Sequence, residues 1–491
     1  MITQSSGSII RRTGFLTVGK ILQSLMSFFA TIYMAHVLGP TDFGILGFTA
    51  AVTSYFGLAS TLGVPTLATR EISQVNDTAS SSFSKEGQIV GDVVFLTGGL
   101  ALISYALLWM LTPIFALTPR LQAILLISGL QVLINALSPQ WAFAGIQRME
   151  FNASANILGT IIRVGLVFLV IHGPNNLEEV PMLAVFGTLT TVVAEWWLFQ
   201  RIRSVRWSLS WPRMWSIFHR SLPMTTASAM MQIYNTIDTI FLGYWDGLGV
   251  VGYYNAAYKL VLFLQSFTTV YNHVVFPLAT RLFLVDKSRL KAQLSLSLSA
   301  TTLITLPTIL GGTWLASPII RTIYGYRFEA ADPVLQILLW TWGISLTILH
   351  YGPVLIACNQ ERRFAQGIVL GSAVNMVANV VAIPLLGDIG AALSILLTEV
   401  AILGYMMHHM TRLVGWYGPS VRTVLGGVFS CGVMLMGLDL FGRRMDLGES
   451  IGFGTVLYGT TLLVSRTITL RQVKRTLEIL APRSWVTPPR L

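Results

Sequence analysis

The stretch LGPTDFGILGF at residues 38–48 follows a long apolar run, and LGVVGYYNAAYKL at residues 248–260 stands in the same place after a later run. A second match joins LTTVVAE, which ends at Glu195, to LSILLTE, which ends at Glu399. In each of these two matches, and in two shorter ones, the second member follows the first by between 204 and 213 residues. Because all of them agree on one register, the sequence predicts two related halves of a single chain.

The composition predicts that both halves lie in a membrane. Mean hydropathy is +0.67, and 53% of the residues are hydrophobic. Only 11% are charged, against about 25% in ordinary soluble domains. A spanning helix needs roughly 20 apolar residues. We therefore expect an all-α polytopic membrane protein of about fourteen transmembrane helices, with no room for a soluble catalytic domain.

Apolar runs between charged or turn-rich breaks place these helices. The predicted spans are 13–37, 42–67, 88–116, 121–144, 152–172, 181–203, 221–243, 249–279, 292–318, 333–357, 364–386, 389–410, 422–441 and 450–469. Pro139 and Pro353 occupy matching places in the two halves and predict kinks, because proline removes a backbone donor and clashes with the preceding turn.

Six spans per half give the expected domain organisation. An N-terminal six-helix lobe covers 1–203, a cytoplasmic linker 204–220, and a C-terminal six-helix lobe 221–412. An extra helix pair follows at 413–470, and a cytoplasmic tail at 471–491. An even number of spans per half puts both halves in the same orientation, as in transporters built from parallel repeats.

The net charge of +11 is explained by topology. With the N-terminus in the cytoplasm, most of the 32 Lys and Arg residues fall in inner loops and tails, as the positive-inside rule requires. Five fall in outer loops, namely Arg120, Arg321, Arg327, Arg443 and Arg444. We therefore expect a multi-pass protein of the inner or plasma membrane with both termini cytoplasmic, and no nucleic-acid partner.

The linker region is both basic and aromatic. Trp207, Trp211 and Trp215 recur at a helical spacing, and Pro212 marks a helix start. Such a segment is typical of an amphipathic helix lying at the lipid interface between the lobes. An ordinary basic loop is the alternative.

Three stretches carry a resemblance to a known family: LGPTDFGILGF at 38–48, IYNTIDTIFLGYWDGLGVVGYYNAAYKL at 233–260, and IPLLGDIGAALSILLTE at 383–399. At these residues the chain resembles the polysaccharide flippases (Wzx-type O-antigen and exopolysaccharide exporters) of the MATE-like superfamily. The resemblance implies two six-helix lobes that open alternately to each side of the membrane. It also implies a cargo, an undecaprenyl-diphosphate-linked oligosaccharide, moved from the cytoplasmic to the outer leaflet.

Three cations fall within the predicted spans, namely Lys20, Arg163 and Lys259. Charges inside a membrane are costly and usually face a cavity or a partner. They are therefore candidates for binding the cargo diphosphate. Lys20 has a competing interpretation, in which it extends to the inner interface. Arg163 has another, in which it forms a structural salt bridge with a carboxylate such as Glu195.

Polar stripes accompany these cations on the first helix of each half. Gln23, Ser24 and Ser27 share a helix face with Lys20. On the seventh span, Gln232, Asn235 and Asp238 follow at i, i+3 and i+6. Polar stripes on two related helices predict the walls of a cavity between the lobes.

Asp238, Glu195 and Glu399 are candidates for proton or ion coupling. Asp238 could instead pair with Lys259, and either glutamate could bridge helices inside its lobe. Cys358 and Cys431 lie in apolar runs and are interpreted as small hydrophobic residues. We expect no metal site, no cofactor and no catalytic residues.

The expected partners are the lipid-linked oligosaccharide, the bilayer and the polysaccharide polymerase machinery, with the chain itself a monomer. Two other functions stay open. A cation-coupled multidrug exporter of the same superfamily would use the three carboxylates. A membrane-embedded glycosyltransferase or polymerase would need a large outer loop with clustered carboxylates or histidines, whereas the loops predicted near 173–180, 319–332 and 442–449 are short.

Overall fold

The computed structural model describes residues 6–76, 82–115, 118–266 apart from 204, 206, 208 and 209, and 279–467. All the regular structure in these residues is helical. The chain forms two compact units. The first comprises Met1–Asn255 with Asn379–Asp388, and the second comprises Ala256–Ala378 with Ile389–Leu491.

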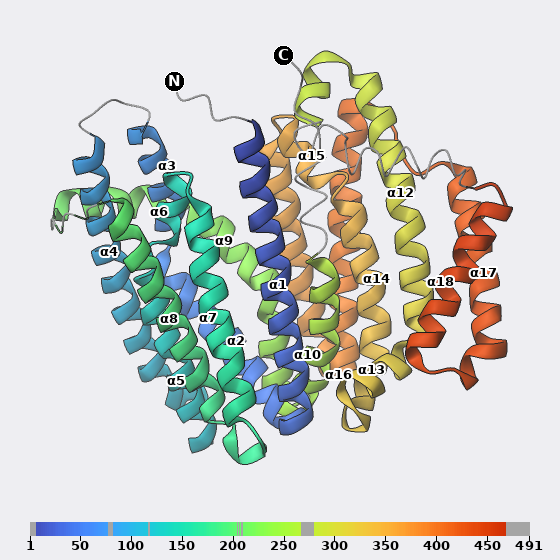
Figure 1. The fold of residues 1–491 in the computed structure, drawn as a ribbon, viewed down its shortest axis with the longest axis horizontal. Coiled ribbons are helices and arrows are strands. Elements are labelled where there is room, and N and C mark those ends of the chain that lie inside the picture. Colours follow the sequence, from blue (N-terminus) through green and yellow to red (C-terminus); the bar gives the residue numbers. More distant parts are fainter. Residues whose placement is uncertain are drawn as a thin grey trace. The chain divides into compact units, whose positions relative to one another are not determined.

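The first unit is a bundle of helices that run largely along one direction (Figure 1). Its members, in chain order, are α1 Ser6–Leu38, α2 Pro40–Thr61, α3 Val64–Asn76, α4 Ser82–Leu111, α5 Pro119–Ala136, α6 Gln140–Gly145, α7 Met149–Val170, α8 Glu179–Ile202 and α9 Trp211–Trp245. Helix α7 packs between α1 and α8, while α2 packs against α4, α5 and α9.

Two predicted spans of this unit are interrupted. The span 42–67 breaks at Leu62 and Gly63, which both have positive φ, so that α2 and α3 are separate helices. Glycine adopts such a backbone at no steric cost, whereas leucine does not. The span 121–144 breaks at Pro139, which caps α6 and confirms the predicted kink.

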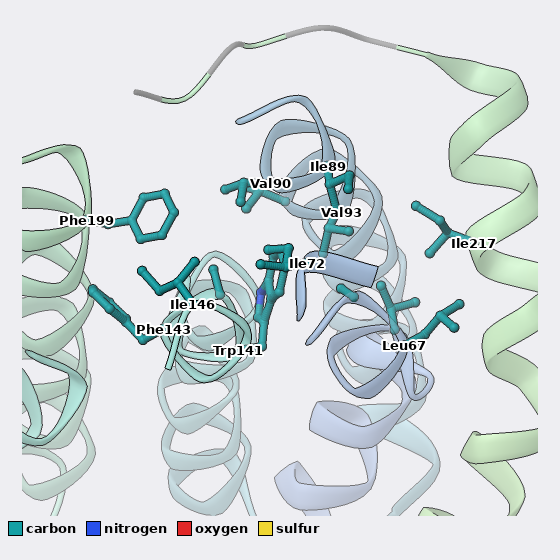
Figure 2. Packing of buried hydrophobic residues seen from close by; sticks show 14 residues of the cluster. Leu67, Ile72, Ile89, Val90, Val93, Trp141, Phe143, Ile146, Phe199 and Ile217 are labelled. Carbon is teal, nitrogen blue, oxygen red and sulfur yellow. The ribbon is translucent and has the colours of Figure 1, made fainter. Parts of the chain in front are cut away.

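The short helices α3 and α6 complete a core at one end of the unit. Leu67 and Ile72 of α3, Trp141 and Phe143 of α6, and residues of α4, α8 and α9 form one buried cluster (Figure 2). Gly145 allows the two short helices to approach closely, because a Cβ there would lie 2.8 Å from Ile72 Cβ. The breaks therefore turn the chain inward to cover the end of the bundle.

The two repeated motifs contact each other inside the first unit. Helix α10 spans Leu248–Gln265, and its residues up to Asn255 belong to this unit. A Cβ on Gly44 of α2 would lie 1.7 Å from the carbonyl oxygen of Leu248. Conversely, a Cβ on Gly252 would lie 2.0 Å from the carbonyl oxygen of Pro40. The backbone of each motif thus packs directly against a glycine of the other motif. A side chain at either position would clash, which explains why both motifs need glycine there.

The predicted linker helix is not a separate element. Helix α9 begins at Trp211 with Pro212 in its first turn, as predicted, but continues without a break to Trp245. Exposed Trp211 and Trp215 stack on this first part of the helix. Pro223 lies inside α9 without ending it, so the amphipathic segment forms the beginning of the seventh helix.

Ion pairs hold the end of α8 and the start of α9 against α4. The Arg203 guanidinium lies 2.9 Å from Glu86, and the Arg213 guanidinium lies 2.8 Å from Asp92. Asp92 is completely buried and also accepts a hydrogen bond from the backbone N–H of Ser210. The basic residues predicted for the cytoplasmic side are therefore partly neutralised by carboxylates of α4.

The second unit contains the end of α10, from Ala256, and the remaining helices. They are α12 Lys287–Trp314, α13 Ala316–Tyr324, α14 Asp332–Ile348, α15 Gly352–Ala357, α16 Glu361–Val414, α17 Val421–Phe441 and α18 Leu447–Val464, except that Asn379–Asp388 of α16 belong to the first unit. Pro353 stands in the first turn of α15, after a break that follows α14, and confirms the second predicted kink. Helix α12 packs against α14 and α17, and α17 packs against α18.

Helix α16 contains the boundary expected between the spans 364–386 and 389–410. Gly387 interrupts it with non-helical backbone angles, so the element consists of two helices joined at a kink. The predicted span 249–279 corresponds to α10, and residues 267–278 lie outside the described part of the chain. The whole of the predicted tail, 471–491, also lies outside it.

Eleven segments of the described residues are long and apolar enough to cross a membrane. One of them is the whole of α16, which the kink at Gly387 divides, and α9 and α10 are not among them. The structure is therefore consistent with the predicted fourteen helices and confirms an all-helical, polytopic membrane fold. The proposed lobe boundaries and the duplication remain predictions.

Candidate functional site

Two of the predicted cavity cations are exposed. Lys20 stands at the start of the apolar part of α1, Gly19–Leu38. Lys259 lies on α10, and its side chain is also exposed. Exposure at the start of the apolar segment also fits an interfacial position for Lys20.

The polar stripe of α1 is directed in part toward α7. The Gln23 amide donates a hydrogen bond of 3.1 Å to the hydroxyl of Thr160. The Arg163 guanidinium donates one of 3.1 Å to the hydroxyl of Ser27. Ser24 is half-buried between these two positions. Gln23 and Ser27 therefore join two helices of the first unit, a role that the stripe alone did not reveal.

Arg163 borders a polar pocket of about 180 Å³ in the first unit. Its lining residues come from α5, α7 and α8: Gln131, Asn135, Asn156, Gly159, Thr160, Arg163, Ala184, Gly187, Thr188 and Thr191. The expected salt bridge with Glu195 is absent: among the described residues Arg163 has only the Ser27 hydrogen bond. We call this cavity the Arg163 pocket.

Glu195 is instead held by a serine beside the Pro139 break. The Ser138 hydroxyl donates a hydrogen bond of 2.5 Å to Glu195, whose side chain is buried. In the second unit, the Ser345 hydroxyl donates to Glu399 in the same way. Ser345 follows Ser138 by 207 positions and Glu399 follows Glu195 by 204, both within the register of the predicted repeat. Each unit thus contains an equivalent serine–glutamate bridge.

The three polar residues of the α9 stripe also lie in different environments. Gln232 donates hydrogen bonds to the hydroxyls of Ser54, at 2.6 Å, and Thr236, at 3.0 Å. Asn235 is exposed and donates to the carbonyl oxygen of Met231 in its own helix. Asp238 is fully buried, and its carboxylate accepts a hydrogen bond from the Tyr254 hydroxyl. Asn235 is the exposed member of the three.

The family of the chain follows from a comparison with known proteins. The model of the family described as polysaccharide biosynthesis protein matches residues 9–283, more than half of the chain. The chain belongs to this family. The match covers the first polar stripe, the Arg163 pocket and both repeated motifs.

Relatives and solved structures agree with this family. A protein of Escherichia coli named as an O-antigen transporter is 24% identical over 82% of this chain and 96% of its own length. The flippase AglR of Haloferax volcanii is 23% identical over 90% of this chain and 93% of its own. The structure of the lipid II flippase MurJ superposes with a TM-score of 0.73 at 14% identity, over 94% and 99% of the two chains.

These likenesses confirm the resemblance to Wzx-type flippases and the membrane fold. They also support a transporter over a glycosyltransferase or polymerase, because the similar proteins are named as transporters and flippases. A multidrug transporter of the MATE family shares the fold at a TM-score of 0.62 and 13% identity. At that identity, the fold is all that the likeness shows.

Reasoning from the sequence missed the hydrogen-bonding partners of the predicted residues. Ser138 and Ser345 carried one usable signal, their separation of 207 residues, which lies within the range of the predicted repeat. Thr160 and Ser54 carried none, because a lone hydroxyl residue in an apolar helix commonly bonds to its own backbone. Contacts between helices far apart in sequence decided which polar residues are engaged.

Proposed function

We propose that the chain is a flippase that moves an undecaprenyl-diphosphate-linked oligosaccharide from the cytoplasmic to the outer leaflet of the inner membrane, with both of its own termini cytoplasmic. The proposal is carried by the family match together with the exposed Lys20 on the polar face of an apolar helix. Flippases for lipid-linked cargo are among the proteins to which the chain is similar.

The physical problem of this transport suits the residues present. A sugar hydroxyl without a partner costs several kcal/mol in hydrocarbon, and an ionised diphosphate costs far more. Lys20 and Lys259 offer compensating charge, while Ser24 and Asn235 offer hydrogen bonds to the sugar. The polyprenyl tail can remain in the bilayer, because it is as apolar as the lipid chains.

Of the predicted site residues, Lys20 and Lys259 carry the cargo proposal most directly, because both are exposed. Gln23 and Ser27 are engaged by α7, and Gln232 by α2. Cargo binding by these three would require them to exchange the hydrogen bonds that they already make. Arg163 borders a pocket of about 180 Å³, which is too small to enclose an oligosaccharide.

The test is an export assay in the strain that carries this chain. Replacing Lys20 and Lys259 together by alanine should abolish surface polysaccharide at normal protein level, and Lys20→Arg should retain export because it keeps the charge. Lys291→Ala, which removes an exposed lysine of α12, is the matched control. Full export by the double variant would refute the site. Proton-gradient-dependent drug resistance without polysaccharide export would favour the multidrug alternative.

Ion coupling through Asp238, Glu195 and Glu399 remains part of this proposal. The serine bridges to Glu195 and Glu399 also fit a structural role, since each joins two helices of one unit. Glu195→Gln separates the two roles, because the amide retains a hydrogen bond to Ser138 but cannot take up a proton. If Glu195 is structural, export by this variant and its dependence on a pH gradient will match those of the native chain.

A further inference from the structure

The Arg163 pocket carries an uncompensated cation inside the first unit. We propose that the pocket binds a small monovalent anion, of which chloride is the physiological example. Neither Lys20 nor Lys259, the cations proposed to bind the cargo, lines this pocket. The proposal therefore does not depend on what the chain transports. It is carried by the charge, the hydrogen-bonding groups and the size of the pocket.

The first observation is the charge of Arg163. A guanidinium remains protonated in proteins and presents five N–H donors. Arg163 lies in the interior of the apolar helix Met149–Val170, and within the described chain only the hydroxyl of Ser27 accepts a bond from it. A cation within a membrane normally faces an anion or a water-filled cavity. Arg163 lines the pocket, and its remaining N–H donors have no acceptor among the described residues.

The second observation is that the protein supplies no counter-charge there. The lining residues include amides, hydroxyls and small residues, but none is Asp or Glu. Glu195, which lies four residues after the lining residue Thr191 on α8, is held by Ser138. Any counter-charge for Arg163 in this pocket therefore comes from a bound ion and not from a lining residue.

The third observation concerns the other donors in the pocket. Neither Gln131 nor Asn135 makes a side-chain hydrogen bond with any described residue, so both amide groups are available to a ligand. Thr188 and Thr191 donate their hydroxyl hydrogens to the carbonyl oxygens of Ala184 and Gly187. The N–H groups of two amides and a guanidinium suit an anion, and the fixed positive charge of Arg163 disfavours a cation.

Size selects among anions. The pocket volume of about 180 Å³ lies below the roughly 300–1,000 Å³ of sites for drug-sized ligands. An oligosaccharide diphosphate does not fit this volume, whereas a halide with one or more waters does. Gly187 lets α8 pack closely against α7 beside the pocket, because a Cβ there would lie 2.7 Å from Arg163 Cβ. The geometry therefore favours a small inorganic ion over the cargo.

The test measures thermal unfolding of the purified full chain in detergent, without lipid-linked cargo, in sodium chloride, bromide or gluconate at equal ionic strength. Chloride or bromide should raise Tm by about 2 °C relative to gluconate, because a ligand that binds the folded state stabilises it by mass action. Arg163→Gln should lose this rise. A native chain with the same Tm in chloride and gluconate would overturn the proposal.

A second variant keeps the test decisive if Arg163→Gln does not fold. Gln131→Glu places a carboxylate in the pocket with almost no change in shape, and should abolish the halide response without lowering Tm in gluconate. Gln140→Glu makes the same change at an exposed position of α6 and should leave the response intact. A halide response that survives in Gln131→Glu would place the ion elsewhere and refute the site.

Two further readouts identify the ion and its position. In crystals grown with bromide, an anomalous peak should lie beside Arg163, and a peak confined to the protein surface would contradict the proposal. In parallel, phosphate at the same ionic strength should stabilise the chain less than chloride does. Stabilisation by phosphate alone would instead assign Arg163 to the diphosphate of the cargo, and the small-anion site would be wrong.

Discussion

The substitution Gly44→Ala tests the contact between the two repeated motifs. The added Cβ would lie 1.7 Å from the carbonyl oxygen of Leu248 and 2.8 Å from the backbone nitrogen of Gly252. Ordinary van der Waals contact begins near 3.4 Å. Because the obstructing atoms belong to the backbone, no side-chain rotation relieves the clash, and α2 and α10 must move apart by about 1.5 Å.

The expected cost follows from this displacement. Overpacking a close contact typically costs 1–3 kcal/mol, and we take about 3 kcal/mol because backbone must move. The higher helix propensity of alanine offsets about 1 kcal/mol of this loss in the free energy of unfolding. The free energy of unfolding should therefore fall by about 2 kcal/mol, which corresponds to a Tm lower by roughly 4–8 °C at the scaling of a 150–250-residue domain.

Gly57→Ala on the same helix is the matched control. No heavy atom lies within 4 Å of a Cβ at Gly57, so this change should gain about 0.5–1 kcal/mol of helix propensity. The assay is thermal unfolding of the two purified variants beside the native chain, followed by circular dichroism. If Gly44→Ala is as stable as Gly57→Ala, the close approach of the two motifs is not a feature of the folded protein.

Two other predictions concern arginines of α9 and the N-terminal cap of α12. Arg213→Gln should cost about 1–3 kcal/mol, because it leaves the buried Asp92 without its ion pair. Arg220→Gln breaks a more exposed pair and should cost about 0.2–1 kcal/mol. Equal losses of Tm would contradict this ranking. Asp286 caps α12, and its pKa lies below the ordinary value because the carboxylate accepts the backbone N–H of Arg289 and hydrogen bonds from Ser288. Protection of the first turn of α12 from hydrogen exchange should be full above pH 4, decrease as the pH falls through the lowered pKa, and be absent in Asp286→Ala.

The amino-acid sequence by itself determined the membrane class and the all-helical fold, and it predicts fourteen spans and an internal repeat. These features depend on composition and on local order along the chain, which hydropathy and spacing record directly. The kinks at Pro139 and Pro353 and the break near Gly387 were predictable for the same reason, because proline and glycine act on their own backbone.

Only the tertiary structure decided what each polar residue does. Gln23, Ser24, Ser27 and Lys20 are equivalent on a helical wheel, yet two of them bond to α7 and Lys20 is exposed. Arg163 was expected to pair with a carboxylate and instead borders a pocket without one. A helix period specifies which residues share a face, but the partner of that face comes from helices more than a hundred residues away, and no local pattern encodes that choice.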